Sequence, residues 1–149
     1  MVADSECPIC AKHRGAGPLV APLIWRDEHV VVSHLGLRSA DSVFLGYLFV
    51  ESRRHVPSLD RLRDDEAAAV GRAAAHAAAA LRAEVDAEHV FSAVIGRGVA
   101  HFHQHVFTRY RGTPDSYAWT AGDDWPGAPR GGLAEVEALC ARLRPHLDR

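Results

Sequence analysis

Three of the chain's ten histidines occupy alternate positions in the segment HFHQHVF, residues 101–107. Successive side chains of a β-strand alternate between its two faces, so His101, His103 and His105 are expected to share one face. Neighbouring histidines there would lie about 6.5–7 Å apart, from the rise per residue of a strand. That spacing is too wide for stacking and suits contacts with different atoms of one ligand.

Two kinds of chemistry use such a row of imidazoles. Alternate histidines on a strand can present two ring nitrogens to zinc. Alternatively, one imidazole can attack a phosphorus atom while its neighbours hold the non-bridging and leaving oxygens. Three unrelated histidines are the third interpretation, and the strict spacing argues against it. A metal-binding module and a phosphate-transferring enzyme are therefore both open.

A second group of candidate ligands is the pair Cys7 and Cys10 in the segment CPIC. Two cysteines at this spacing form the commonest half of a structural zinc site. A redox pair would need a helix that starts at the first cysteine. We expect residues 1–22 to be irregular, so the sequence does not favour a redox pair. A reduced pair without metal is the remaining alternative.

The histidine and cysteine segments need elements to position them. Strands are expected from Trp25 to His34 and over 42–52, 89–96 and 101–110, from their β-branched and apolar residues. An Ala-rich segment with acidic residues at its start predicts a helix over about 64–86, and an amphipathic helix is expected over 133–147. We therefore predict one α+β domain over 1–149, with an antiparallel sheet of about five strands, a long helix and a C-terminal helix.

Composition excludes some partners. The 149 residues suit one domain, and 48% hydrophobic with 24% charged residues is ordinary for a globular protein. The formal net charge of −2 gives no electrostatic footprint for nucleic acid or an anionic membrane. No apolar run reaches about 18 residues, and the N-terminus lacks the features of a signal peptide. A cytoplasmic protein with reduced cysteines is expected.

The segment HFHQHVF resembles the signature of the histidine-triad (HIT) family, which alternates three histidines with apolar residues. The segment GYLFVESRRHV, which contains His55, is similar to the strand and turn that the family places earlier in the chain. The N-terminal CxxC and the acidic start of the long helix add support. The resemblance covers roughly residues 7–110.

The resemblance implies a nucleotide hydrolase. His103 would attack the α-phosphorus of a dinucleoside polyphosphate or a nucleoside phosphoramidate and form a covalent nucleotidyl-histidine, which water hydrolyses. His105 would hold phosphate oxygens or give a proton to the leaving group, and a histidine at this position favours hydrolases over the family's transferases. A non-catalytic nucleotide-binding protein is the alternative within the same resemblance.

The resemblance also implies a structural zinc ion held by Cys7, Cys10, His55 and His101, with His13 as a local alternative ligand. Family members usually pair through the long helix and an extended sheet, so a homodimer is expected.

Several positions depart from the family pattern. The acidic residue that usually binds ribose is replaced by Ser33 or His34. Arg97 stands where a glutamine is frequent, and Arg109 is retained after the triad, so both are candidate partners of the substrate phosphate.

Overall fold

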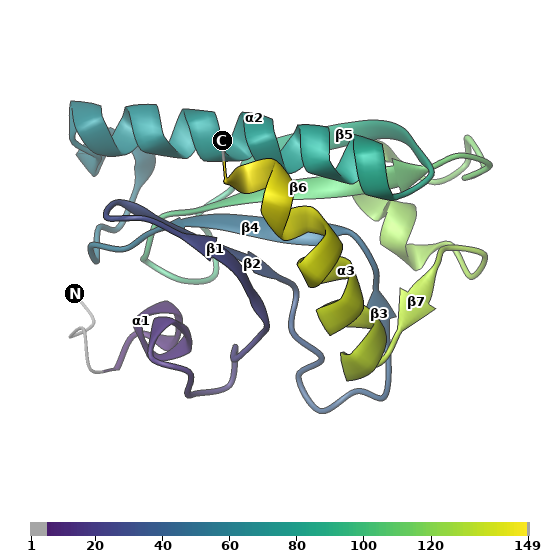
Figure 1. Ribbon diagram of the computed structural model, residues 1–149, viewed down its shortest axis with the longest axis horizontal. Helices are drawn as coiled ribbons and strands as arrows, with labels where there is room; N and C mark the ends of the chain where they lie inside the picture. Colours follow the sequence, from purple (N-terminus) through teal and green to yellow (C-terminus); the bar gives the residue numbers. More distant parts are fainter. Residues whose placement is uncertain (1–5, 149) are drawn as a thin grey trace.

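The computed structural model describes residues 6–148, which form a five-stranded antiparallel sheet with three α-helices (Figure 1). The order of the strands across the sheet is β1-β2-β4-β6-β5. Their bounds are Leu23–Arg26 for β1, Val30–His34 for β2, Tyr47–Ser52 for β4, His103–Tyr110 for β6 and Ala87–Val94 for β5. The predicted α+β class, with its five-stranded antiparallel sheet, is confirmed.

One face of the sheet is covered by α2 (Asp64–Glu84) and α3 (Leu133–Leu147) (Figure 1). The side of α2 that faces the sheet is mostly alanine, and Ala73, Ala77 and Ala80 are fully or almost fully buried there. These small side chains let the helix axis approach the sheet, where it packs on larger residues such as Leu48 and Val106. The helices thus leave the other face of the sheet for the histidines.

A third helix, α1 (Pro8–His13), lies on the opposite side of the sheet from α2 (Figure 1). The expectation of irregular structure over residues 1–22 is therefore wrong for this segment. Cys7 is the N-cap, its Sγ accepts a hydrogen bond from the backbone N–H of Cys10 at 3.4 Å, and Pro8 takes the first helical position. Six residues are too few for an apolar periodicity, so only the cap could have indicated this helix.

Two of the predicted strands are broken by turns. Between β1 and β2, the carboxylate of Asp27 accepts hydrogen bonds from the backbone N–H groups of His29 and Val30, both at 2.7 Å, and closes a hairpin. The predicted strand over 42–52 splits at Gly46, whose φ is +95° and where an added Cβ would lie 2.8 Å from Thr108. The part before Gly46, β3 (Val43–Phe44), instead pairs with β7 (Arg130–Gly131) in a separate small sheet.

The first histidine of HFHQHVF precedes its strand. The strand β6 begins at His103, and the backbone at Phe102 instead bridges to the segment after β4, where its N–H donates to the carbonyl of Val56 at 2.7 Å. The prediction that all three histidines share one face of a single strand therefore holds only for His103 and His105.

Two short 3₁₀ helices complete the chain, η1 (Leu59–Arg61) and η2 (Trp119–Asp124). Within residues 6–148, every helix is too short or too polar to cross a bilayer.

Candidate functional site

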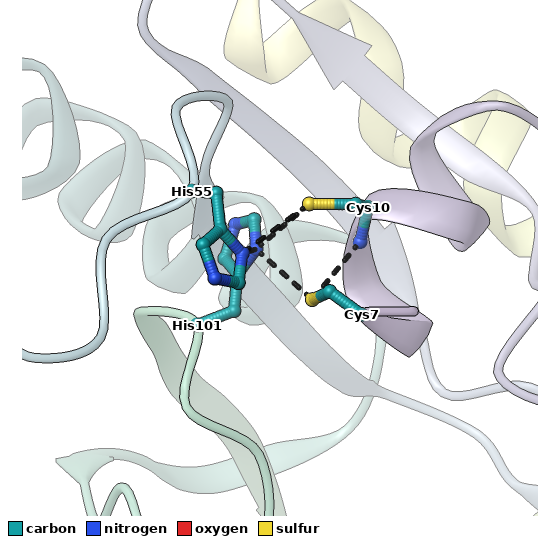
Figure 2. A group of neighbouring side chains, drawn as sticks. All are labelled: Cys7, Cys10, His55 and His101. Carbon is teal, nitrogen blue, oxygen red and sulfur yellow. Dashed lines mark hydrogen bonds between the residues drawn. The ribbon is translucent and has the colours of Figure 1, made fainter. Parts of the chain in front are cut away.

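Two cysteines and two histidines from three parts of the chain meet beside the sheet (Figure 2). Cys7 and Cys10 come from the start of α1, His55 follows β4, and His101 precedes β6. The Nδ1 atom of His101 lies 3.4 Å from each cysteine Sγ, and the Nδ1 of His55 lies 3.4 Å from Cys10 and 3.3 Å from the Nδ1 of His101. All four ligand atoms lie within 4.8 Å of one another.

These separations fit a tetrahedral zinc ion. With zinc–sulfur bonds of about 2.3 Å and zinc–nitrogen bonds of about 2.05 Å, sulfur and nitrogen lie about 3.6 Å apart and two nitrogens about 3.3 Å apart. The Nε2–H of His101 donates to the carbonyl of Ser52 at 2.7 Å, so the neutral ring keeps its lone pair on Nδ1, toward the cysteines. Burial lowers the pKa of His101 to about 4, which keeps that lone pair available. The four predicted ligands therefore lie together in an arrangement that fits a structural zinc ion.

His13 lies next to this group and does not belong to it. Its Nε2–H donates to the carboxylate of Glu51 at 3.0 Å, and the other oxygen of Glu51 accepts from the Nζ of Lys12 at 2.6 Å. Lys12 and Glu51 are 4% and 1% exposed, so this is a buried ion pair between α1 and β4. Burial alone raises the pKa of Glu51, but the hydrogen bond from His13 and the charge of Lys12 outweigh it and hold the pKa low.

The ring of His103 is oriented by the backbone of His101. A carbonyl oxygen can only accept, so the Nδ1 of His103, at 2.7 Å from the carbonyl of His101, is the donor in this bond. In the neutral imidazole the other nitrogen, Nε2, then carries a free lone pair. Nucleophilic attack through Nε2 needs this tautomer.

His105 lies beside His103 on the same face, with 5.3 Å between the ring centroids and an angle of 56° between the planes. Its Nδ1 lies 2.8 Å from the hydroxyl of Tyr47 on β4. Burial and the neighbouring charge of His103 lower the pKa of His105. Burial, with a smaller contribution from Asp123, raises the pKa of Tyr47 to about 12, so the hydroxyl keeps its proton at neutral pH.

His103 and His105 line a cavity of about 350 Å³ between α1, β4 and the loop before β6. The volume is in the range of small-molecule sites. Three charged residues, Lys12, Arg38 and Glu51, also line this cavity. Arg38 was not predicted as a site residue. It is exposed and adopts a φ of +50°, and neither property is indicated by the residues around it.

The positions that replace the family's ribose-binding acid are both buried and hydrogen-bonded. The hydroxyl of Ser33 accepts from the Nζ of Lys12 at 3.1 Å. The Nδ1–H of His34 donates to the carbonyl of Leu35 at 2.8 Å, and its Nε2 accepts from the backbone N–H of Gly46 at 3.0 Å. Neither residue presents a carboxylate, and the acid that lines this cavity is Glu51 from the neighbouring strand.

The two candidate phosphate-binding arginines have different surroundings. Arg97 is exposed in the loop between β5 and β6. The guanidinium of Arg109 is 11% exposed, donates to the carbonyls of Pro114 and Tyr117 at 3.0 and 3.1 Å, and lies 3.6 Å from Glu88. Arg109 thus holds the loop after β6 against the sheet.

No family model matches the sequence, and no curated protein does. Among solved structures, the chain is similar to a Zn-bound histidine triad family protein from Mycobacterium smegmatis, with 21% identity, a TM-score of 0.69 and coverage of 98% of this chain and 96% of that one.

Two further solved structures agree. A Hit-like protein involved in cell-cycle regulation from Bartonella henselae is 14% identical, with a TM-score of 0.69 and coverage of 99% and 100%. A hypothetical histidine triad nucleotide-binding protein from Sulfolobus tokodaii strain7 is 17% identical, with a TM-score of 0.64 and coverage of 87% and 85%. The chain has the fold of the histidine triad proteins, as HFHQHVF indicated.

Proposed function

We propose that this chain, which has the histidine triad fold, is a nucleotide hydrolase that acts through a nucleotidyl group on Nε2 of His103. The observation that supports this most is the bond from Nδ1 of His103 to the carbonyl of His101, which leaves Nε2 with a free lone pair at the wall of a cavity. Dinucleoside polyphosphates and nucleoside phosphoramidates are the candidate substrates.

The reaction has two displacements at phosphorus. In the first, the Nε2 lone pair of His103 forms a bond to the α-phosphorus, and the bond to the leaving group breaks with its electron pair on the leaving atom. Protonated His105 donates a proton to the leaving atom. The pKa of His105 is lowered, so its protonated form is less populated but is a stronger acid. In the second displacement, water attacks phosphorus, neutral His105 takes the water proton, and His103 is released.

Other residues have supporting roles in this proposal. Arg97 and Arg38 are the cations that can meet phosphate oxygens, Arg97 from the loop before the triad and Arg38 from the cavity wall. Arg109 acts by holding its loop, through the carbonyl contacts described above. Zinc would be held by Cys7, Cys10, His55 and His101, and it would fix the backbone at His101 that orients the nucleophile.

A trapping experiment tests the proposal. The protein is mixed with labelled adenosine phosphoramidate and with labelled diadenosine tetraphosphate, quenched at alkaline pH, and the mass of the chain is measured. We expect a covalent nucleotidyl adduct on wild type and none on His103→Ala, with hydrolysis reduced by at least about 10³-fold. His89→Ala, which removes an exposed histidine from β5, is the matched control and should keep the adduct.

The same variants separate the metal-binding alternative from the proposal. If His103 bound the metal, zinc content would fall in His103→Ala; if it is the nucleophile, zinc content stays equal to wild type. Tight nucleotide binding without an adduct or turnover would instead support a non-catalytic nucleotide-binding protein, which the absence of a carboxylate at Ser33 and His34 makes the second candidate.

A further inference from the structure

A second cavity, beside the zinc ligands, is lined mainly by arginines. It has a volume of about 430 Å³, and its basic lining residues are Arg14, Arg26, Arg53 and Arg54. The other lining residues are His13 and two of the candidate zinc ligands, Cys10 and His55 (Figure 2). This cavity shares no lining residue with the cavity of His103 and His105, so it is a separate site.

The positive charge of this arginine cavity is largely uncompensated. Arg54 has a counter-charge, because its Nε and Nη2 each lie 2.9 Å from Oε1 of the buried Glu66. Within residues 6–148, no carboxylate forms an ion pair with Arg14, Arg26 or Arg53, and no acidic residue lines the cavity. A zinc ion with two thiolate and two neutral histidine ligands carries no net charge, so the neighbouring metal site would not balance these cations either.

Backbone carbonyls hold two of these guanidinium groups in place. Nη2 of Arg26 donates to the carbonyl of His13 at 3.0 Å, and Nη1 of Arg53 donates to the carbonyl of Asp27 at 2.9 Å. A carbonyl contact orients a guanidinium group without removing its charge, and each group has five N–H donors, so most of them remain for a ligand. The cations are thus positioned before an anion binds.

We infer that the arginine cavity binds a small anion with two or more phosphate groups, at a site separate from the proposed substrate site. Guanidinium groups bind phosphate oxygens through pairs of parallel hydrogen bonds. A single phosphate group has too few oxygens for such pairs with Arg14, Arg26 and Arg53 together, so linked phosphates match the cavity better. The volume is in the range of small-molecule sites, and the inference does not depend on the proposed function.

The bound anion would connect three elements of the fold. Arg14 is the C-cap of α1, Arg26 is the last residue of β1, and Arg53 directly follows β4. An anion that contacts all three would attach the end of α1 to the sheet beside Cys10 and His55. Because such a ligand binds the folded chain and not the unfolded one, it should also raise the unfolding temperature.

Calorimetric titration of the zinc-loaded full chain with inorganic pyrophosphate tests the inference. We expect one pyrophosphate per chain with a Kd below about 0.1 mM. Arg14→Gln and Arg53→Gln should each raise the Kd at least about tenfold, because each removes charge-assisted hydrogen bonds. Arg72→Gln, which removes an exposed arginine from α2, is the matched control and should keep the Kd of wild type.

Thermal unfolding of the same zinc-loaded proteins is the second measurement. Without pyrophosphate, the three variants should unfold at the temperature of wild type, because the side chains that they change are exposed. Pyrophosphate should then raise the unfolding temperature of wild type and of Arg72→Gln, and should have little effect on the two cavity variants.

Three results would overturn the inference. Equal heats in wild type and in the cavity variants would place the binding elsewhere, or would come from removal of zinc, which the zinc content after titration detects. Tighter binding of citrate than of pyrophosphate would mean that the cavity selects carboxylates. If wild type does not bind pyrophosphate and the cavity variants lose zinc, the arginines stabilise the cysteine thiolates instead.

Discussion

At the scale of single residues, this site depends on which nitrogen of each histidine carries the proton. Backbone carbonyls determine this for two of them: the carbonyl of Ser52 receives the Nε2–H of His101, and the carbonyl of His101 receives the Nδ1–H of His103. His101 and His103 therefore present opposite nitrogens, His101 its Nδ1 to the cysteines and His103 its Nε2 to the cavity. Because of this difference, the same type of side chain could bind a metal at His101 and act as the proposed nucleophile at His103.

A third histidine, His34, has both ring nitrogens in hydrogen bonds, and this arrangement predicts that the stability of the fold depends on pH. Burial lowers its pKa, against a smaller opposite effect of its bond to Leu35, so the folded state holds it neutral with Nε2 as an acceptor. Below its ordinary pKa of about 6.5 the unfolded chain binds a proton that the folded chain does not. The stabilisation is therefore complete above pH 6.5 and is lost as the pH falls below it, by up to about 1.4 kcal/mol per pH unit.

Urea unfolding of wild type and His34→Gln between pH 7.5 and 5 measures this effect. Glutamine offers one donor and one acceptor without titrating, so we expect the pH slope of the variant to be smaller in the acid range. If the free energy of unfolding has the same pH slope in both proteins, His34 does not contribute to the pH dependence of stability.

At the scale of elements, α1 is attached to the sheet twice. Its cysteines reach His55 and His101, and Lys12 with His13 reaches Glu51 on β4. The first attachment needs a metal ion and the second does not. The helix also forms part of the cavity wall through Ile9 and Lys12, so its position matters for ligand binding.

Metal removal should loosen α1, and the chain contains a natural reporter of this. Lys12 is its single lysine and is 4% exposed. We expect lysyl endopeptidase to cleave after Lys12 at least tenfold faster when a chelator is present than when zinc is, because the cysteine attachment is lost. Cys7→Ser should be cleaved fast under both conditions, and arginine-specific cleavage elsewhere should not respond to the chelator. An equal rate of cleavage after Lys12 with zinc and with chelator would contradict the assignment of a zinc site to Cys7, Cys10, His55 and His101.

The second attachment predicts a stability effect at pH 7. Glu51→Gln leaves the ammonium of Lys12 buried without its counter-charge, which we expect to cost about 3–5 kcal/mol in the free energy of unfolding. The double variant Lys12→Met with Glu51→Met removes both charges and should recover most of that loss, because well-packed apolar residues replace buried ion pairs without large cost. Urea denaturation of the three proteins, each saturated with zinc, measures the difference.

Sequence patterns predicted the elements with strong periodicity and missed those that depend on distant partners. The long helix over 64–86 is found at Asp64–Glu84, and the C-terminal helix at Leu133–Leu147. The short α1, the break at Gly46 and the position of His101 outside the strand were not predictable, because a six-residue helix, a positive φ and a hydrogen bond from Phe102 to Val56 leave no periodic pattern in the sequence. For the site, the spacing indicated that His103 and His105 share one face of a strand, which the structure shows, whereas the positions of Glu51 and Arg38 at the same cavity required the tertiary structure.

At the scale of the whole molecule, the sheet ends at β5, whose outer edge has no partner strand among the described residues. The outer face of α2 runs alongside and carries exposed alanines, among them Ala75 and Ala79. An open edge and a helix face of small side chains allow the close approach of a second copy, in agreement with the homodimer that the family resemblance implies.

The mass of the protein in solution, measured by light scattering as it elutes from a size-exclusion column, tests for this dimer. We expect a mass of twice 16.2 kDa for wild type and a shift toward 16.2 kDa for Ala75→Glu with Ala79→Glu, because two carboxylates would then face their copies across the contact. Ala138→Glu, which places the same charge on the exposed face of α3, should keep the mass of wild type. A wild-type mass of 16.2 kDa would show that the chain is a monomer and would contradict the expected dimer.

His101 also connects two parts of the site through one residue. Its ring faces the cysteines, and its carbonyl accepts the Nδ1–H of His103. A shift of α1 that moves the cysteines would therefore be passed to the proposed nucleophile across a single peptide group. The orientation of that ring would then depend on a helix that lies far from it in sequence.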